Sequence, residues 1–269
     1  MRNGLTQLQV VVQGVGDIGS AVAVALIRAG HRVVLIDGPQ PTTTRRRMAF
    51  ADAVFDGQAT LEGITAIRVD DGCELARLLA GAAAIPVVIG ELQPLLDQVR
   101  PDVLVDARMR KRTHPAPQRG LASLTIGLGP NFVAGETVDV AIETEWGDAL
   151  GTVLTCGATR PLRGEPRSIA GHARDRYVYA PTAGVFQTDC VIGQPIAVDQ
   201  PVAQIGPAGL RAPLSGTLRG LTHDAVPVEI GTKVIEIDPH LEDALVTGVG
   251  ERPAKIAQGV LDAIQQVDW

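Results

Sequence analysis

Residues Leu8–Asp37 read LQVVVQGVGDIGSAVAVALIRAGHRVVLID, and this stretch decides the expected fold class. The apolar run Leu8–Val12 predicts a buried strand, and Ala21–Ala29 has the pattern of a helix that stops at Gly30. The run Val33–Ile36 predicts a second strand, which ends in the acidic residue Asp37. Strand, glycine turn, helix and strand in this order predict a Rossmann-like unit.

The turn between the first strand and the helix contains three glycines with separate expected roles. We expect Gly14 to permit the tight turn, Gly16 to let the backbone approach a phosphate, and Gly19 to let the helix pack on the strand. The free N–H groups of the helix N-terminus favour an anion. The same glycines are also compatible with a fold that uses them for packing alone.

Composition limits the function classes that fit this chain. The 269 residues carry a net charge of −6, which argues against general nucleic-acid binding. Cys73, Cys156 and Cys190 are isolated and show no metal-ligand spacing, so the sequence predicts neither disulfides nor a metal site. With no signal pattern and no long apolar run, we expect a cytoplasmic protein without membrane contact. The sequence leaves the oligomeric state open.

Helix and strand patterns alternate as far as residue 137, and strands dominate after it. The first half includes a predicted hairpin over Ala59–Val69 with its turn at Glu62–Gly63, a helix over Leu92–Val99 and a strand over Val103–Asp106. We therefore predict an α/β fold, a Rossmann-like doubly wound parallel sheet followed by a mostly β, barrel-sandwich-like domain. The expected units are a cofactor-binding domain (1–137), a β-rich connecting segment (138–177), a repeat domain (178–240) and a C-terminal helical segment (241–269).

An internal repeat supports the second domain. Ala180–Gly184 (APTAG) recurs as Ala212–Gly216 (APLSG), 32 residues later. Such paired β units resemble the barrel-sandwich fold of biotinyl and lipoyl carriers. The joint Gly206–Arg211 has no lysine to carry a swinging arm, so a structural or interaction role is favoured.

Several unusual residues follow predicted strands and should meet at the carboxyl edge of the sheet, where α/β folds bind ligands. Asp37 suits a ribose hydroxyl, although a turn role is equally compatible. Two basic clusters, Arg45–Arg47 and Arg108–Arg112, could clamp phosphate or form solvated surfaces. The predicted cofactor-binding residues are Gly14, Gly16, Asp17, Gly19, Asp37, Arg45, Arg46, Asp106, Arg110, Lys111, Gly127, Gly129 and Asn131.

Catalytic residues are harder to assign. We expect Asp17 to cap the helix, or to lie beside a metal bound together with the ligand. Glu143 and Glu145 are two apart on a predicted strand and could do acid/base work, but an exposed strand face explains them as well. The histidines are scattered, and no catalytic base is identified.

Taken together, many short motifs resemble the YqeB-type family, which is named for selenium-dependent molybdenum hydroxylase systems. The matching positions are Gly14–Gly19, Pro41, Arg45–Arg46, Phe50–Val54, Pro101–Ala107, Ile126–Pro130, Gly135, Leu218–Leu221, Val226–Val228, Gly231, Lys233 and Ile237–Pro239. The resemblance spans nearly the whole chain, whereas a generic Rossmann enzyme shares only the first motif.

The resemblance implies an accessory protein, or chaperone, that matures molybdenum hydroxylases. Its implied cofactor is molybdopterin or the dinucleotide form, and its implied partner is the hydroxylase apoenzyme. The repeat domain would dock on that enzyme or on the other domain of this chain. Two alternatives remain. Asp37 favours an NAD(P)-dependent oxidoreductase, and a non-catalytic nucleotide-binding scaffold would use the same glycine turn.

Overall fold

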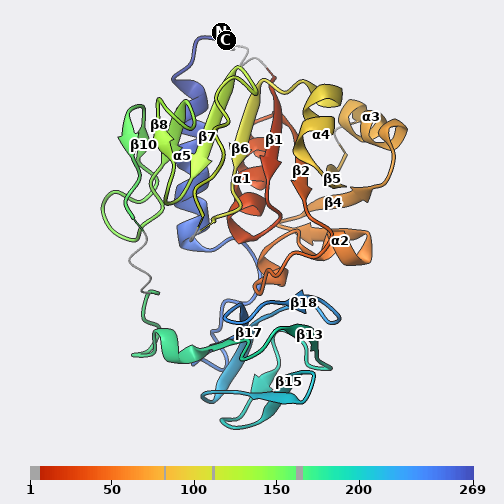
Figure 1. Ribbon diagram of the computed structural model, residues 1–269, viewed down its shortest axis with the longest axis vertical. Coiled ribbons are helices and arrows are strands. Elements are labelled where there is room, and N and C mark those ends of the chain that lie inside the picture. The colour runs from red at the N-terminus through yellow and green to blue at the C-terminus, as the bar shows by residue number, and fades with distance from the viewer. Residues whose placement is uncertain (1–6, 82, 111–112, 162–165) are drawn as a thin grey trace.

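The computed structural model describes residues 7–81, 83–110, 113–161 and 166–269 (Figure 1). Its larger part is built on one extended sheet flanked by helices, and its smaller part consists of short strands below that sheet. The smaller part is defined here as residues Tyr177–Asp238.

Helices and strands alternate in the first part of the chain. In order, these elements are β1 (Gln9–Gln13), α1 (Asp17–Arg28), β2 (Arg32–Asp37), the 3₁₀ turn η1 (Arg46–Met48), α2 (Asp52–Asp56), β3 (Gln58–Leu61), β4 (Ile64–Val69), α3 (Gly72–Gly81), β5 (Ile85–Ile89), α4 (Leu92–Val99) and β6 (Val103–Asp106).

Short strands follow, and one long helix ends the chain. These elements are β7 (Leu124–Leu128), β8 (Val133–Ala134), β9 (Val140–Ile142), β10 (Val153–Leu154), β11 (Gly157–Ala158), the 3₁₀ turn η2 (Arg174–Arg176), β12 (Tyr177–Tyr179), β13 (Gly184–Gln187), β14 (Pro195–Ile196), β15 (Pro201–Ile205), β16 (Ala208–Arg211), β17 (Gly216–Leu221), β18 (Pro227–Val228), β19 (Lys233–Asp238) and α5 (Glu251–Gln265).

The large sheet has nine strands in the order β10-β9-β7-β6-β1-β2-β5-β4-β3. The seven inner strands run parallel, while β3 and β10 pair antiparallel at the two edges. The sheet is therefore mixed. The hairpin β3–β4 turns at Glu62–Gly63, as the sequence pattern predicts, and both turn residues have positive φ.

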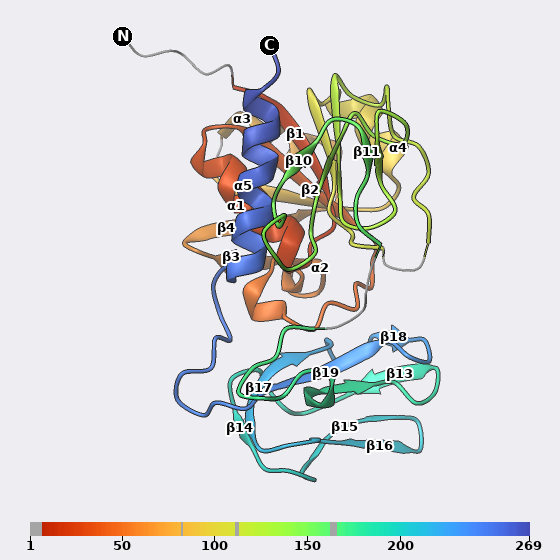
Figure 2. The ribbon, with the colours of Figure 1, turned by 90° about the vertical axis from the view of Figure 1, so that its left-hand side faces the viewer.

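Successive side chains of a strand point to opposite faces, and this alternation builds two separate cores. Val10 and Val12 of β1 belong to the core that includes residues of α1 and α5. Val11, between them, belongs to the core formed with residues of α3 and α4. Figure 2 shows α1 and α5 side by side on the first face, and their contact is extensive.

The smaller part is made of two four-stranded antiparallel sheets, β12-β19-β17-β14 and β16-β15-β13-β18. The sequence repeat is visible in its strands, because β13 and β17, β14 and β18, and β15 and β19 each begin 32 residues apart. The middle strands are exchanged: β14 of the first copy pairs with β17 of the second, and β18 pairs with β13. One shared core joins both copies, so neither copy forms its core alone.

The prediction of a Rossmann-like doubly wound parallel sheet followed by a barrel-sandwich-like domain is wrong. The observed arrangement is a large mixed sheet with small antiparallel sheets. The described residues between β6 and β7, and those between β7 and β9, contain no helix. That part of the sheet is instead covered by α5, which comes from the far end of the chain and contacts β7, β9 and β10. Local sequence patterns cannot show that a helix from the end of the chain packs on this part of the sheet.

Within the described ranges, none of the helices combines the length and the apolar character that a membrane span needs.

The close contact at Gly19 gives a first prediction. A Cβ at Gly19 would lie 2.0 Å from the carbonyl oxygen of Gly14, whereas a Cβ at Gly81 has no heavy atom within 4 Å. We expect Gly19→Ala to lower the free energy of unfolding by about 1–3 kcal/mol or more, because helix and turn must separate. Gly81→Ala is the control and should stay within about 1 kcal/mol of the parent. Urea unfolding measures both, and equal stabilities would contradict the assigned packing.

Candidate functional site

The glycine turn is tightly constrained by its neighbours. Gly14 has φ of +107°, and its N–H donates to the carbonyl of Ile36 at 2.8 Å. A Cβ at Gly14 would meet the backbone of Ala107 at 3.2 Å. At Gly16 the nearest atom to such a Cβ is the hydroxyl of Thr43, at 3.5 Å. Gly14 and Gly19 are thus fixed by packing, and Gly16 is the glycine with room beside it.

Asp37 closes the turn from the end of β2. Its carboxylate accepts hydrogen bonds from the N–H groups of Val15, at 2.9 Å, and Gly38, at 2.8 Å. Burial raises the pKa of Asp37 more than these two hydrogen bonds lower it. The carboxylate therefore holds the turn in shape, and its proposed contact with a ribose hydroxyl remains a prediction.

The expectation that Asp17 caps α1 is met only in part, because Asp17 is not the cap residue but its side chain accepts one N–H of the first turn. Gly16 occupies the cap position with an extended backbone. Asp17 is the first helical residue: its Oδ1 accepts from the N–H of Ile18, and its Oδ2 pairs with Arg45 Nη1 at 3.2 Å. The side chain of Asp17 is thus directed into an ion pair with the residue that joins the two parts of the chain.

A charge cluster lies between the carboxyl edge of the large sheet and the smaller part. At its centre Glu236 is fully buried, and its carboxylate accepts two hydrogen bonds from Arg45, at 2.9 and 3.0 Å. Arg176 Nη1 donates at 2.7 Å and Lys233 Nζ at 3.0 Å. The charge cluster consists of Asp17, Arg45, Arg176, Arg219, Lys233, Glu236 and Asp238.

The pKa values of Glu236 and Lys233 in the charge cluster are lowered, and the pKa of the neighbouring Tyr177 is raised. Burial alone would raise the pKa of Glu236, but the charges of Lys233 and Arg45 outweigh it and hold the pKa well below its ordinary value. Burial lowers the pKa of Lys233, assisted by the charge of Arg45 and opposed by that of Glu236. Burial, and then the charge of Glu236, raises the pKa of Tyr177, whose ring lies against both Arg176 and Lys233.

The first basic cluster, Arg45–Arg47, joins the two parts of the molecule. Arg46 Nε donates to the carbonyl of Leu221 at 2.8 Å, and its Nη1 pairs with Asp52 at 2.6 Å. Arg47 Nη1 donates to the carbonyl of Ile192 at 3.0 Å. All three arginines therefore bind protein groups, and a ligand that needed them would have to compete for them.

The second basic segment surrounds a buried acid at the end of β6. Asp106 accepts from Arg108 Nε at 2.9 Å and from the Gln118 amide at 2.7 Å. Arg110 is exposed, and the carbonyl of Arg110 accepts a long hydrogen bond from the Asn131 amide, at 3.5 Å. Lys111 lies outside the described residues. Asn131 thus supports the backbone of this loop.

Gly127 within β7 and Gly129 just after it serve packing. A Cβ at Gly127 would lie 2.3 Å from the ring of Phe132, so glycine makes room for that ring. Gly129 has φ of +102° and lies beside Met109. Its carbonyl accepts from the hydroxyl of Thr159 at 2.6 Å.

Glu143 and Glu145 do not share a strand face, because β9 ends at Ile142. The carboxylate of Glu143 is buried and accepts three backbone N–H groups at 2.7–2.8 Å, from Thr144, Glu145 and Arg160. A carboxylate satisfied in this way shapes the loop rather than acting as a paired acid/base.

Arg252, in the first turn of α5, is a residue that sequence reasoning missed. Its Nε donates to the carbonyl of Thr144 at 2.8 Å. Burial lowers its pKa, while the charge of Asp17 raises it and that of Arg45 lowers it, so Arg252 lies within electrostatic reach of the charge cluster. Arg252 comes near the charge cluster because α5 packs beside α1, and the sequence alone does not show this packing.

Other residues of the charge cluster were also missed. Arg176 and Glu236 received no predicted role, and Arg219, Lys233 and Asp238 entered only through the family resemblance. One signal was available: Glu236 interrupts the apolar run Val234–Ile237, and a charge in a buried strand requires partners.

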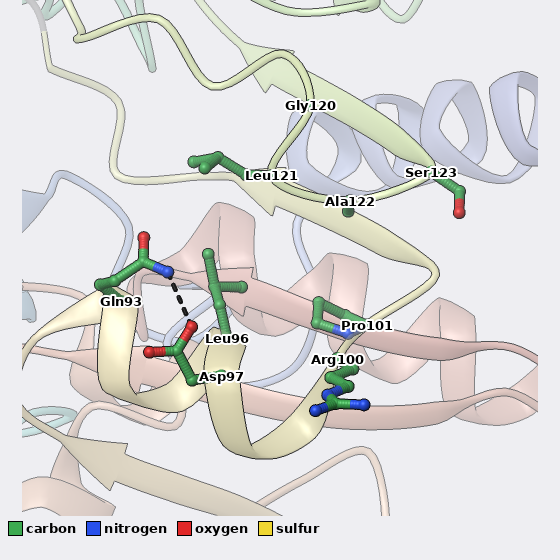
Figure 3. Close-up of a pocket in the computed structure, with 9 residues that line it drawn as sticks. All are labelled: Gln93, Leu96, Asp97, Arg100, Pro101, Gly120, Leu121, Ala122 and Ser123. Atoms are coloured by element: carbon green, nitrogen blue, oxygen red, sulfur yellow. Dashed lines mark hydrogen bonds between the residues drawn. The ribbon is translucent and has the colours of Figure 1, made fainter.

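A pocket elsewhere on the molecule holds none of the predicted site residues. It lies between the end of α4 and the segment before β7, at the opposite edge of the sheet (Figure 3). Its polar groups include Arg100 and Ser123, and the Gln93 amide donates to Asp97 at 2.9 Å. This pocket offers no pairing of a nucleophile with a base.

No protein-family model matches the chain. The chain is 38% identical over 258 residues to a curated protein of Escherichia coli (strain K12) named Uncharacterized protein YqeB. The match covers 96% of this chain and 47% of that protein, so the chain spans about half the length of the curated relative it matches. The similarity supports a YqeB-type family.

Solved structures give only distant likenesses. A succinylglutamate desuccinylase/aspartoacylase family protein of Shewanella amazonensis SB2B matches with a TM-score of 0.24 and 14% identity, covering 87% of this chain and 91% of that one. The ectoine utilization protein EutE (DoeB) of Ruegeria pomeroyi matches with a TM-score of 0.26 and 13% identity, covering 86% and 85%. Likenesses this weak carry no argument about activity.

The buried carboxylate gives a second prediction. Because folding lowers the pKa of Glu236, its ionised form stabilises the folded state above its ordinary pKa of 4.5, and this contribution is lost as the pH falls toward the lowered value. Glu236→Gln leaves buried cations uncompensated and should cost about 3–5 kcal/mol at neutral pH. The difference from the parent should shrink below pH 4.5. Unfolding curves from pH 7 to 3 measure it.

Glu229→Gln is the matched control, since Glu229 is exposed on the same part of the chain. It should remain within about 0.5 kcal/mol of the parent. A Glu236→Gln difference that is small, or independent of pH, would contradict the assigned ion pairs.

Proposed function

We propose that this chain binds a phosphate-bearing cofactor, molybdopterin or its dinucleotide, and serves as an accessory protein in molybdenum hydroxylase maturation. The observation that carries the proposal is the N-terminus of α1, which begins at Asp17, has no side-chain cap at Gly16 and lies beside the charge cluster. Helix N-termini bind phosphate through free N–H groups and the helix dipole.

The residues around this helix end suit an anion. Gly16 leaves room for close approach of a phosphate oxygen, with Thr43 at the edge of that space. Asp37 and Gly14 hold the turn rigid. The ion pair with Arg45 offsets the repulsion that Asp17 would exert on a phosphate.

The net charge around the N-terminus of α1 also favours an anion. The four cationic side chains of the charge cluster outnumber its three carboxylates, and Arg252 adds a further positive charge nearby. Arg176 Nε has no hydrogen-bond partner among the described residues. An excess of buried donors and positive charge favours binding of an anion from solution.

The biological assignment rests on the family. The similarity to YqeB supports the YqeB-type family. The link to molybdenum hydroxylases comes from the resemblance of the short motifs alone. A hydroxylase apoenzyme is accordingly the proposed protein partner. The cofactor would supply the metal-binding chemistry, while this chain would hold the phosphate.

The test is mass spectrometry of small molecules released from anaerobically purified protein. We expect a pterin or pterin dinucleotide in the parent and at least about tenfold less of it in Gly16→Asp, because a carboxylate at Gly16 repels phosphate and fills its space. Gly81→Asp adds the same charge at an exposed helix end and should retain the ligand.

Other ligands would contradict the proposal. NAD(P) released in place of a pterin would favour the oxidoreductase alternative. A nucleotide bound tightly without turnover or transfer would favour the scaffold. Equal amounts of pterin in the parent and in Gly16→Asp would place the site away from the glycine turn.

A further inference from the structure

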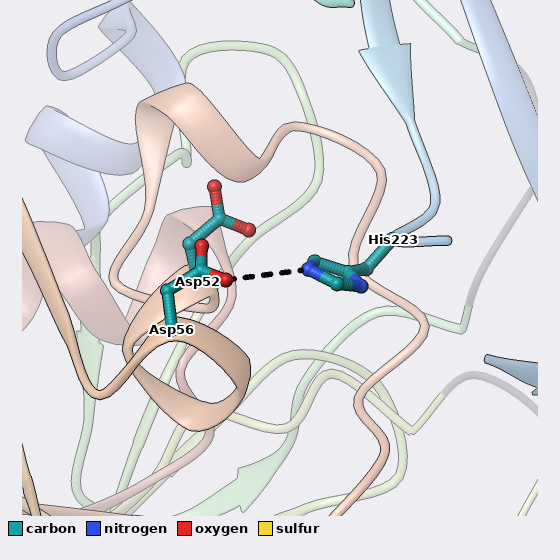
Figure 4. A group of neighbouring side chains, drawn as sticks. All are labelled: Asp52, Asp56 and His223. Carbon is teal, nitrogen blue, oxygen red and sulfur yellow. Dashed lines mark ion pairs between the residues drawn. The ribbon is translucent and has the colours of Figure 1, made fainter. Parts of the chain in front are cut away.

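We propose that Asp52, Asp56 and His223 form a binding site for a divalent first-row transition ion. The site lies where α2 meets the loop between β17 and β18, and it therefore takes ligands from both parts of the molecule (Figure 4). It is separate from the glycine turn, and the inference does not rest on the proposed function.

The three side chains converge. One potential ligand atom from each residue lies within 4.8 Å of those from the other two. Asp52 and Asp56 are four residues apart on α2, so their carboxylates project from the same side of one helical turn. Figure 4 shows the ring of His223 facing this pair from the other side.

The imidazole of His223 is oriented by groups outside the cluster. Its Nδ1 lies 2.8 Å from the carbonyl of Asp224, an acceptor, so Nδ1 carries the proton that is donated. Its ring stacks on Phe55, with centroids 4.0 Å apart. Metal-ligating histidines commonly show this arrangement, in which a carbonyl fixes one nitrogen and frees the other.

The other ring nitrogen of His223, Nε2, faces the carboxylate of Asp56 at a distance that is close to the spacing of two ligands on one metal ion. Nε2 of His223 lies 3.7 Å from Asp56 Oδ1, too far for a hydrogen bond. Two ligands bound tetrahedrally at about 2.0–2.2 Å from one zinc ion are roughly 3.4 Å apart. A cation between Nε2 of His223 and Oδ1 of Asp56 would stabilise these two electron-rich atoms at this separation.

The donor set selects the class of ion. One imidazole with two carboxylates suits Zn²⁺ and related ions, whereas Mg²⁺ and Ca²⁺ prefer oxygen ligands alone. Arg46 bonds the carboxylate of Asp52 at 2.6 Å and supplies the outer hydrogen bond that orients a ligating carboxylate. A bound ion would link α2 to the β17–β18 loop and so stabilise the contact between the two parts.

Titration calorimetry of the chelator-treated full chain with Zn²⁺ tests the site. We expect one equivalent bound, at least about tenfold weaker binding in Asp56→Asn and His223→Phe, and a rise in Tm with Zn²⁺ for the parent. Asp56 is exposed, and phenylalanine retains the stacking on Phe55, so both variants should fold. Asp189→Asn removes an exposed carboxylate elsewhere and should bind as the parent does.

Two results would overturn the inference. If the parent binds no Zn²⁺, or if Asp56→Asn and His223→Phe bind it as tightly as the parent, His223 and Asp56 form only an ion pair. If Mg²⁺ binds as tightly as Zn²⁺, the imidazole is not a ligand and the assigned class of ion is wrong.

Discussion

The bidentate ion pair between Arg45 and the buried Glu236 connects the glycine turn to the smaller part. Arg45 follows the strand that carries Asp37, and Glu236 lies in the last strand of the smaller part. Arg45 also holds Asp17 at the N-terminus of α1. One guanidinium therefore fixes the glycine turn and the smaller part relative to each other. Such a buried pair costs desolvation, so its stability depends on the further bonds from Arg176 and Lys233.

Local structure in the first part of the chain could be predicted from the sequence, while the architecture could not. Periodicity located α4 at Leu92–Val99 and β6 at Val103–Asp106, because these elements bury regular apolar faces. The covering of the sheet by α5, the antiparallel edges and the exchange of strands between the repeat copies all depend on contacts between distant segments. No local pattern carries that information.

The candidate site, too, could be predicted from the sequence only where local patterns carry the information. The glycines of the turn were recognised because tight backbone contact requires them, and Gly14 and Gly19 make such contacts. The partners of Arg45 and Arg46 were missed, because Glu236 and Leu221 are far away in the chain. A sequence shows that a basic cluster exists but not whether its charges are already neutralised. For the same reason, His223 gave no hint of its proximity to Asp56.

The most direct test of this account is a double-mutant cycle on Arg45→Met and Glu236→Gln, measured by urea unfolding at neutral pH. If this ion pair holds the two parts together, the double variant should be more stable than the sum of the single losses predicts, by at least about 1 kcal/mol. Losses that add within about 0.5 kcal/mol would show that the two residues act independently, and would contradict the central role of this interaction.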